Sequence, residues 1–240
     1  MKTIGLIGGM SWESTVLYYQ LINEGVKQRL GGLHSARIIL YSVDFAEVEH
    51  LQRTGNWAAA GELLAQAAHK LQGAGAEALV LCTNTMHKVA NAIEAAVQIP
   101  LLHIADPTAA RIRQAGLGKV GLLGTRFTME QDFYKVRLQQ RHGLQVLVPS
   151  VPEREEVHRI IYEELCLGQV LDDSRSTYKR VMADLVAQGA QAIILGCTEI
   201  SLLIAPEDAS VPLFDTTAIH ALSAVDWALS PCCATPPQSR

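Results

Sequence analysis

The chain repeats itself, and this repeat constrains the fold more than any other feature. The segment IGLIGG (residues 4–9) resembles VGLLGT (120–125), and GAEALVLCTNT (75–85) resembles GAQAIILGCTE (189–199). The offsets are 120 − 4 = 116 and 189 − 75 = 114 residues, and a partial match of IPLLHIAD with VPLFD has an offset of 211 − 99 = 112. Three matches in the same order at nearly one offset predict two similar halves.

Each half alternates two kinds of segment. Runs rich in β-branched residues are separated by longer segments with helical periodicity; the runs include TIGLIG, ARIILYSVD, EALVLC, KVGLLGT and QAIILGC. This alternation is typical of βαβ units, and therefore of mainly parallel sheets flanked by helices. We predict an α/β fold of two similar domains related by a pseudo-twofold axis. The active site is expected in the cleft between them, since ligands of parallel sheets lie beyond the carboxyl ends of the strands.

The domain limits follow from where the second copy begins. We expect residues 1–106 together with 216–230 to form the first lobe, with the last helix returning to it. Residues 107–215 are expected to form the second lobe, and residues 231–240, which include Cys232 and Cys233, a disordered tail.

Composition and charge narrow the class of protein. The net charge is −4, and Lys and Arg form no run suited to nucleic acid or to a membrane surface. The N-terminal MKTIGLIGGMSWE is better interpreted as a first strand than as a signal peptide, because Glu13 interrupts its apolar stretch. Five cysteines, an odd number at irregular spacing, favour free thiols in a reducing cytoplasm. The eight histidines lack the spacing of a zinc site, so no metal is expected.

Polar residues follow the two strands of the second repeat pair. Thr83 and Cys197 are counterparts, because 197 − 83 = 114 is the local offset of the repeat. Successive side chains of a strand point to opposite faces, so if Thr83 faces the cleft, Cys82 faces the core. A cysteine at a strand end is often only a small apolar residue, but Cys197 precedes Thr198 and Glu199 and has a polar counterpart. A thiol there could act as a general base or nucleophile.

The turns after the first strand of each half are further candidates. The backbone N–H groups that follow Gly8 and Gly9 could hold a carboxylate, although a tight turn without a ligand explains the pattern equally well. In the second half Thr125 is expected to point its hydroxyl toward a ligand, and Thr128 with Gln131 fits a capping box.

Weaker candidates lie elsewhere in the chain. An arginine such as Arg53, next to Gln52, could bind a carboxylate bidentately, although most such arginines are solvated. His87 could orient a neighbour, or it could be a cap or a solvated residue, and Cys166 fits a helix interior.

Taken together, GLIGGM, TNT, LLGT and GCTE in this order, in two α/β halves, resemble the aspartate/glutamate racemase superfamily. The resemblance covers Ile4 to about Ala228. It is strongest, through MSWESTVLYYQLINEGVKQRLGGLHSA, CTNTMHK and GCTEI, to the branch of bacterial amino-acid racemases that includes an L-aspartate/glutamate-specific enzyme. It implies racemisation without pyridoxal phosphate or any other cofactor, by two bases on opposite faces of the α-carbon.

The resemblance also assigns roles to single residues. The family's two catalytic cysteines match Thr83 and Cys197, and Cys197 is implied to deprotonate the L-amino acid while Thr83 assists on the other face. Because a threonine hydroxyl is a very weak acid, reaction from the D-enantiomer is expected to be poor. The implied substrate-binding residues are Met10, Ser11, Asn84, Thr85, Thr125 and Thr198, with Gln52 and Arg53 as candidates for contact with the substrate's side chain. A homodimer is expected, since this family commonly dimerises.

The choice of substrate stays open at this point. Aspartate-specific members tend to carry a lysine where Gln169 stands here, so neutral L-amino acids are an alternative to L-aspartate and L-glutamate. Two further functions also stay open: a malonate-type decarboxylase that uses one cysteine, and a non-catalytic protein that binds a small acid.

Overall fold

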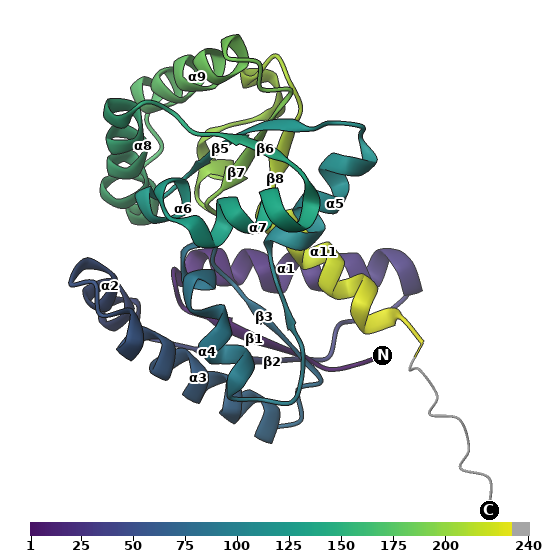
Figure 1. Ribbon diagram of the computed structural model, residues 1–240. Helices are drawn as coiled ribbons and strands as arrows, with labels where there is room; N and C mark the ends of the chain where they lie inside the picture. Colours follow the sequence, from purple (N-terminus) through teal and green to yellow (C-terminus); the bar gives the residue numbers. More distant parts are fainter. Residues whose placement is uncertain (232–240) are drawn as a thin grey trace, which may run out of the picture.

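The computed structural model describes residues 1–231 and contains two parallel sheets of four strands each (Figure 1). The first sheet has the order β2-β1-β3-β4 and the second has the order β6-β5-β7-β8. The strands are β1 (Ile4–Gly8), β2 (Ile38–Ser42), β3 (Ala78–Leu81), β4 (Leu101–Leu102), β5 (Lys119–Gly124), β6 (Gln145–Leu147), β7 (Ala192–Gly196) and β8 (Leu213–Asp215). The identical strand order in both halves confirms the predicted fold class.

The repeat seen in the sequence corresponds to the central strands of the two sheets. β1 pairs with β3 in one sheet, and β5 pairs with β7 at the matching place in the other. All five residues of β1 and all five of β7 are buried, which explains why these strands are continuous apolar runs rather than alternating ones.

Helices cover both faces of the first sheet. Its helices are α1 (Trp12–Leu30), α2 (Phe45–Arg53), α3 (Trp57–Gly73) and α4 (Ala90–Ala95), with the 3-10 helix η1 (Thr85–Val89) after β3. α3 packs on one face through Leu64, Ala68 and Leu71. The other face is covered by α1 and by the last helix, α11 (Thr216–Leu229), which shares a core with β1. Segments from the two ends of the chain therefore lie side by side (Figure 1).

The second sheet is covered in the same way. α5 (Ala105–Gln114) and α7 (Asp132–His142) lie on one face, and α8 (Val151–Glu163) and α9 (Asp172–Ala187) lie on the other. Shorter elements are α6 (Arg126–Glu130), η2 (Leu165–Leu167), α10 (Ile200–Leu203) and η3 (Pro206–Asp208). The predicted limits of the domains stay a prediction, and residues 232–240, most of the expected tail, lie outside the described residues.

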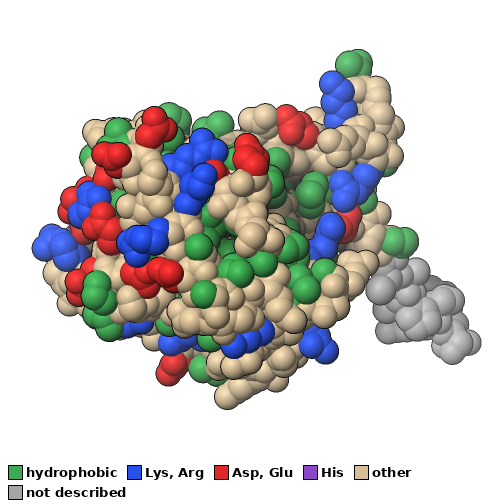
Figure 2. All heavy atoms as spheres, turned by 90° about the horizontal axis from the view of Figure 1, so that it is seen from above, with side chains coloured by type: hydrophobic (Ala, Val, Ile, Leu, Met, Phe, Trp, Pro, Cys, Tyr) green, Lys and Arg blue, Asp and Glu red, His purple; other side chains and the backbone are tan. Residues whose placement is uncertain are grey.

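Three further features are the turn after β1, the charges on one face of the molecule and the apolar character of the helices. Gly9, after β1, has φ of 94°, and a Cβ there would clash with the backbone oxygen of Val43, so only glycine fits this turn. Figure 2 shows acidic and basic side chains intermingled on the face seen from above. Within residues 1–231, no helix has the length and apolar character needed to cross a membrane.

Candidate active site

A small cavity between the two sheets collects most of the candidate residues. Its lining comes from the carboxyl ends of β1, β3, β5 and β7 and from α2, α8 and η2. The lining residues are Met10, Phe45, Gln52, Thr83, Asn84, Thr85, Thr125, Ile161, Tyr162, Cys166, Gly196, Cys197, Thr198 and Glu199. The volume of this cavity is only about 20 Å³. The two halves therefore meet tightly here, and a substrate enters only if the lining moves.

Cys197 sits directly after β7 and is 8% exposed. Its thiol donates to Oε2 of Glu199 at 2.9 Å. Burial raises the pKa of Cys197 well above the usual value, and the negative charge of Glu199 raises it further. The thiol is therefore protonated in this closed arrangement, with a carboxylate in contact with its proton.

Glu199 joins the two lobes. Its Oε1 accepts from the Ser11 hydroxyl at 2.9 Å and from the Ser14 hydroxyl at 2.6 Å, both at the start of α1. Its Oε2 accepts from Thr198 at 2.6 Å as well as from Cys197. Four donors around one buried carboxyl group form the environment of an ionised carboxylate, which accepts hydrogen bonds and donates none.

Thr83 follows β3 and is partly exposed to the same cavity. Its backbone carbonyl is held by Nδ1 of the buried His87 at 2.8 Å. Nε2 of that ring accepts from the Ile104 N–H at 3.2 Å, so Nδ1 carries the proton and donates to Thr83. Burial lowers the pKa of His87 well below its usual value, which keeps the ring neutral. His87 therefore orients the backbone of Thr83, which is one of the roles that the sequence left open. It is buried, so the alternative of a solvated histidine is wrong.

Cys82 is fully buried in the core formed by β1, α1 and α11. Its sulfur lies 3.9 Å from the Val80 oxygen, and burial raises the pKa of the thiol far above its usual range. The prediction that Cys82 faces the core is confirmed, since Cys82 is absent from the cavity lining while Thr83 is part of it.

The neighbouring polar residues also converge on the cavity. The hydroxyls of Thr85 and Thr125, from opposite lobes, are 2.9 Å apart. Asn84 donates from Nδ2 to Thr216 at 3.0 Å, whereas its buried Oδ1 has no partner among residues 1–231. A buried acceptor without a partner is costly, so this atom is suited to a donor that a ligand supplies.

Two sequence predictions about local structure differ from the structure. The cap of α6 is Thr125, whose hydroxyl accepts from the Thr128 N–H at 3.3 Å, and Thr128 lies inside the helix instead of capping it. Cys166 is not inside an α-helix, because α8 ends at Glu163 and Cys166 falls in η2, beside the cavity.

Gln52 and Arg53 are separated by the geometry of α2. Gln52 lines the cavity, where its Oε1 accepts from the Tyr162 hydroxyl of α8 at 3.0 Å. Arg53 is not in the lining: its side chain is 65% exposed and pairs with Glu49 at 3.4 Å. Adjacent residues of a helix point about 100° apart, so one of the two faces away from the cleft. No Lys or Arg occurs among the described residues that line the cavity.

Sequence reasoning missed several residues of the cavity. Glu199 was visible two positions after Cys197 in GCTE, but its contacts with Ser11 and Ser14 depend on how the lobes meet. Phe45, Ile161 and Tyr162 carry no motif that would have placed them at the cleft.

Comparison with known proteins finds similar sequences and similar structures. The sequence profile of the Asp/Glu/hydantoin racemase family matches residues 7–224. A crystal structure from Yersinia pestis, of a protein assigned to the Asp/Glu racemases, is 63% identical with a TM-score of 0.91, and the alignment covers 96% of this chain and 100% of that one. An aspartate racemase homologue from Pyrococcus horikoshii is 36% identical with a TM-score of 0.83, and the alignment again covers 96% and 100% of the two chains.

Curated relatives are more distant. A glutamate racemase from Persephonella marina is 26% identical over 147 residues, which cover 58% of this chain and 52% of that enzyme, so the match spans about half the length of that relative. The broad-specificity amino-acid racemase RacX from Bacillus subtilis is 24% identical over 161 residues, which cover 67% of this chain and 69% of RacX. Since the family profile extends over nearly the whole of both lobes, the chain belongs to the Asp/Glu/hydantoin racemase family.

Proposed function

We propose that the protein is a cofactor-independent amino-acid racemase that acts on L-aspartate and L-glutamate. Cys197 removes the α-proton of the L-substrate, and Thr83 assists on the opposite face. The observation that carries this proposal is the hydrogen bond from the Cys197 thiol to Glu199, inside a closed cavity that Thr83 lines from the other lobe.

The first step transfers the thiol proton to Glu199. The raised pKa of Cys197 means that the thiol does not ionise by itself near neutral pH, whereas the carboxylate oxygen at 2.9 Å is in position to accept its proton. The thiolate then takes the α-proton, and the electron pair of the C–H bond stays on the α-carbon. Hydrogen-bond donors around the α-carboxylate stabilise this carbanion-like state.

The second step returns a proton from the Thr83 side. A threonine hydroxyl ionises far too weakly to act as an anionic base, but it can pass on a proton from a water molecule beside it. The carbanion-like α-carbon takes the proton on that face, which gives the D-enantiomer. Cys197 keeps the α-proton as its thiol proton, Glu199 releases its proton to solvent, and the hydroxide left by the water takes up a proton from solvent, which restores the starting state. In the reverse direction Thr83 must remove the α-proton of the D-substrate, so this direction is slow.

Substrate binding is assigned to the remaining polar groups of the cavity. The unpaired Asn84 Oδ1 accepts a hydrogen bond from the α-ammonium group. One of the paired hydroxyls of Thr85 and Thr125, together with the backbone N–H groups of the Met10–Ser11 turn and of Thr198, supplies donors for the α-carboxylate. Gln52 lies at the α2 side of the cavity and contacts the substrate's side chain, and Arg53 reaches it only if α2 rearranges.

One observation favours a second substrate class. A carboxylate in a buried site is best bound by Arg or Lys, and the described cavity lining contains neither. Racemisation of neutral L-amino acids is therefore the alternative. Incubation in D₂O with L-aspartate, L-glutamate and a panel of neutral L-amino acids, read by deuterium incorporation at the α-carbon, separates the two. Faster exchange with neutral substrates favours the alternative, and no exchange with any amino acid overturns the racemase assignment.

A homodimer in the cytoplasm completes the proposal. Trp12, Val16 and Tyr19, spaced by four and three residues on one face of α1, are 64%, 53% and 53% exposed. Exposed apolar faces of this kind commonly bind another protein surface. The free thiols of Cys82, Cys166 and Cys197 support a reducing compartment. Sedimentation equilibrium tests the dimer, and a monomeric mass at micromolar concentration contradicts it.

A further inference from the structure

A second cavity lies between the lobes, outside the proposed active site. It has a volume of about 320 Å³ and is lined on one side by η1, α4 and His103, and on the other side by α7. His87 borders it and also holds the Thr83 carbonyl. None of the steps proposed for racemisation uses this cavity.

His103 offers an unused hydrogen-bond donor to this cavity. The residue is 5% exposed, and its Nδ1 accepts from the Ala105 N–H at 3.2 Å. The proton of the neutral ring therefore resides on Nε2, which has no hydrogen-bond partner among residues 1–231. Burial, together with nearby Arg137, lowers the pKa of His103 to about 2, so the ring stays neutral. The Nε2 atom is open to solvent, so its N–H is free to donate to a ligand in the cavity.

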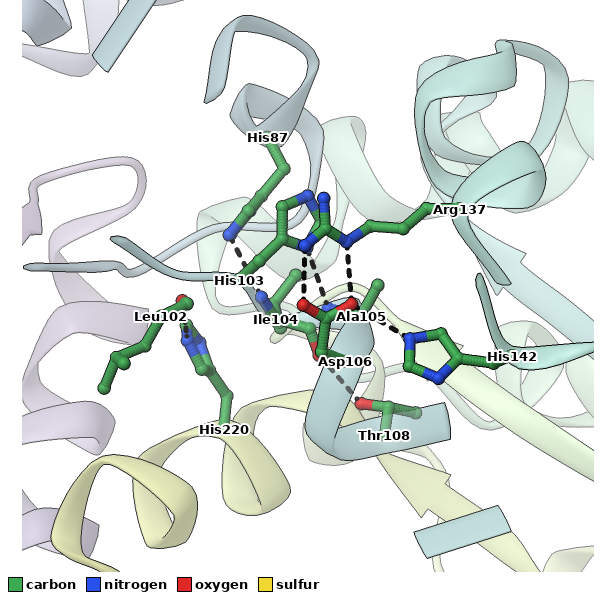
Figure 3. A network of polar contacts seen from close by, with 10 residues as sticks. All are labelled: His87, Leu102, His103, Ile104, Ala105, Asp106, Thr108, Arg137, His142 and His220. Atoms are coloured by element: carbon green, nitrogen blue, oxygen red, sulfur yellow. Dashed lines mark hydrogen bonds and ion pairs between the residues drawn. The ribbon is translucent and has the colours of Figure 1, made fainter. Parts of the chain in front are cut away.

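Two arginines of α7 add positive charge on the opposite side. Figure 3 shows Arg137 reaching toward Asp106, with the ring of His103 beside it. Arg137 uses Nε and one terminal nitrogen to bind Asp106, and the other terminal nitrogen has no partner within the described part of the chain. Arg141, exposed at the rim, makes no ion pair or side-chain hydrogen bond with residues 1–231.

Asp106 offsets the charge of Arg137, but Lys88 and Arg141 outnumber Asp132 among the other charged groups of the lining, so the cavity stays positive. Lys88 also borders the cavity, but its ammonium lies over the Trp57 ring at 3.8 Å from the centroid. Asp132 is the only acidic residue among the lining residues described. His142, which does not line the cavity, also contacts Oδ1 of Asp106, at 3.0 Å.

We propose that this cavity is a binding site for a phosphate group, either free or carried on a small molecule. Arginine side chains bind phosphate through paired hydrogen bonds, and Arg141 is free to do so. Arg137, also on α7, offers its remaining terminal nitrogen, and the His103 Nε2–H approaches the cavity from the other side. Because the first lobe supplies His103 and the second supplies both arginines, an occupant bridges the two lobes. The site is separate from the Cys197–Glu199 pair, so its existence does not depend on the proposed racemase activity.

Isothermal titration calorimetry tests this proposal on the full-length protein without any turnover. Inorganic phosphate and glycerol 3-phosphate are titrated separately at constant ionic strength, held with NaCl. We expect saturable binding to one site, and the loss of one charge-assisted hydrogen bond in Arg141→Gln is expected to weaken binding by roughly 10- to 100-fold. Tighter binding of the ester identifies a phosphate carried on a small molecule, and equal or weaker binding identifies free phosphate.

Two further variants make the outcome specific. Arg113→Gln, which removes an exposed arginine of α5 that does not line the cavity, is the matched control and should bind like the wild type. His103→Asn keeps an oxygen near the Ala105 N–H but removes the Nε2 donor, so it should also weaken binding. The proposal is overturned if neither probe binds saturably, or if Arg141→Gln and Arg113→Gln bind phosphate equally well.

Discussion

At the scale of single residues, the thiol of Cys197 and the carboxylate of Glu199 act together in the proposed reaction. The thiol donates to the carboxylate at 2.9 Å, and two hydroxyls from the start of α1 hold the carboxylate in place. Because the pKa of Cys197 is raised, the protein needs an internal acceptor to form a thiolate near neutral pH.

Replacing that acceptor changes both the rate and its dependence on pH. In the wild type the proton stays within the pair, so kcat/KM for the L-substrate is expected to be nearly constant around neutral pH. In Glu199→Gln the thiol must lose its proton to solvent, so kcat/KM should fall by about 100-fold or more at pH 7. It should then rise about tenfold per pH unit below the thiol pKa. A pH–rate series on both proteins measures this, and a Glu199→Gln profile as high and as flat as that of the wild type contradicts the role.

In the proposed mechanism, Thr83 limits the rate at which the D-enantiomer reacts. Thr83→Cys supplies an ionisable group at that place, so α-proton exchange from the D-enantiomer should increase by at least about tenfold. Exchange is followed by NMR in D₂O for each enantiomer. Cys82→Ala is the matched control, because it truncates a buried side chain at the adjacent position. It should lower the stability of the protein and leave the exchange rate of the D-enantiomer unchanged. If α-proton exchange of the D-enantiomer is unchanged in Thr83→Cys, the assignment of Thr83 to the active site is contradicted.

At the scale of helices and strands, α2 forms one wall of the cavity. The hydrogen bond from Tyr162 to Gln52 links α2 to α8 across the lobes, and the cavity is nearly closed behind it. On the outer side of α2 lies an open groove of about 870 Å³, lined only by residues of the first lobe. This open space leaves room for α2, and we expect this helix to move when a substrate enters.

Removal of this link should affect binding more than chemistry. Tyr162→Phe loses one neutral hydrogen bond across the cavity, so KM should rise by roughly 3- to 10-fold with little change in kcat. Steady-state kinetics with the L-substrate measure both constants. Tyr19→Phe, at an exposed tyrosine of α1, serves as the control and should leave both constants unchanged. An unaltered KM in Tyr162→Phe would mean that the link does not help to close the site.

How much the sequence predicted depends on whether a feature is local. The repeat located the strand ends, and strand alternation then separated Thr83 from Cys82, since both signals lie within a few residues. The contact of Glu199 with Ser11 joins residues 188 positions apart and depends on how the lobes meet. For the same reason the sequence could not tell which of Gln52 and Arg53 faces the cleft, because that depends on the rotation of α2.

At the scale of the whole molecule, the two sheets place their strand ends around one cavity. Each lobe contributes one side chain of the proposed pair, Thr83 from the first and Cys197 from the second. Glu199 is bonded across the same boundary to Ser11 and Ser14, so the proposed base is complete only when the lobes are together. In the proposed mechanism, this arrangement places one of the two groups on each face of the substrate's α-carbon.

The most direct test is deuterium incorporation at the α-carbon of the L-substrate in D₂O by the wild type and by Cys197→Ser. The wild type should incorporate deuterium, and Cys197→Ser, with a hydroxyl of much weaker acidity, should incorporate none above background while circular dichroism shows an unchanged fold. Exchange by Cys197→Ser at the wild-type rate would contradict the assignment of Cys197 as the base.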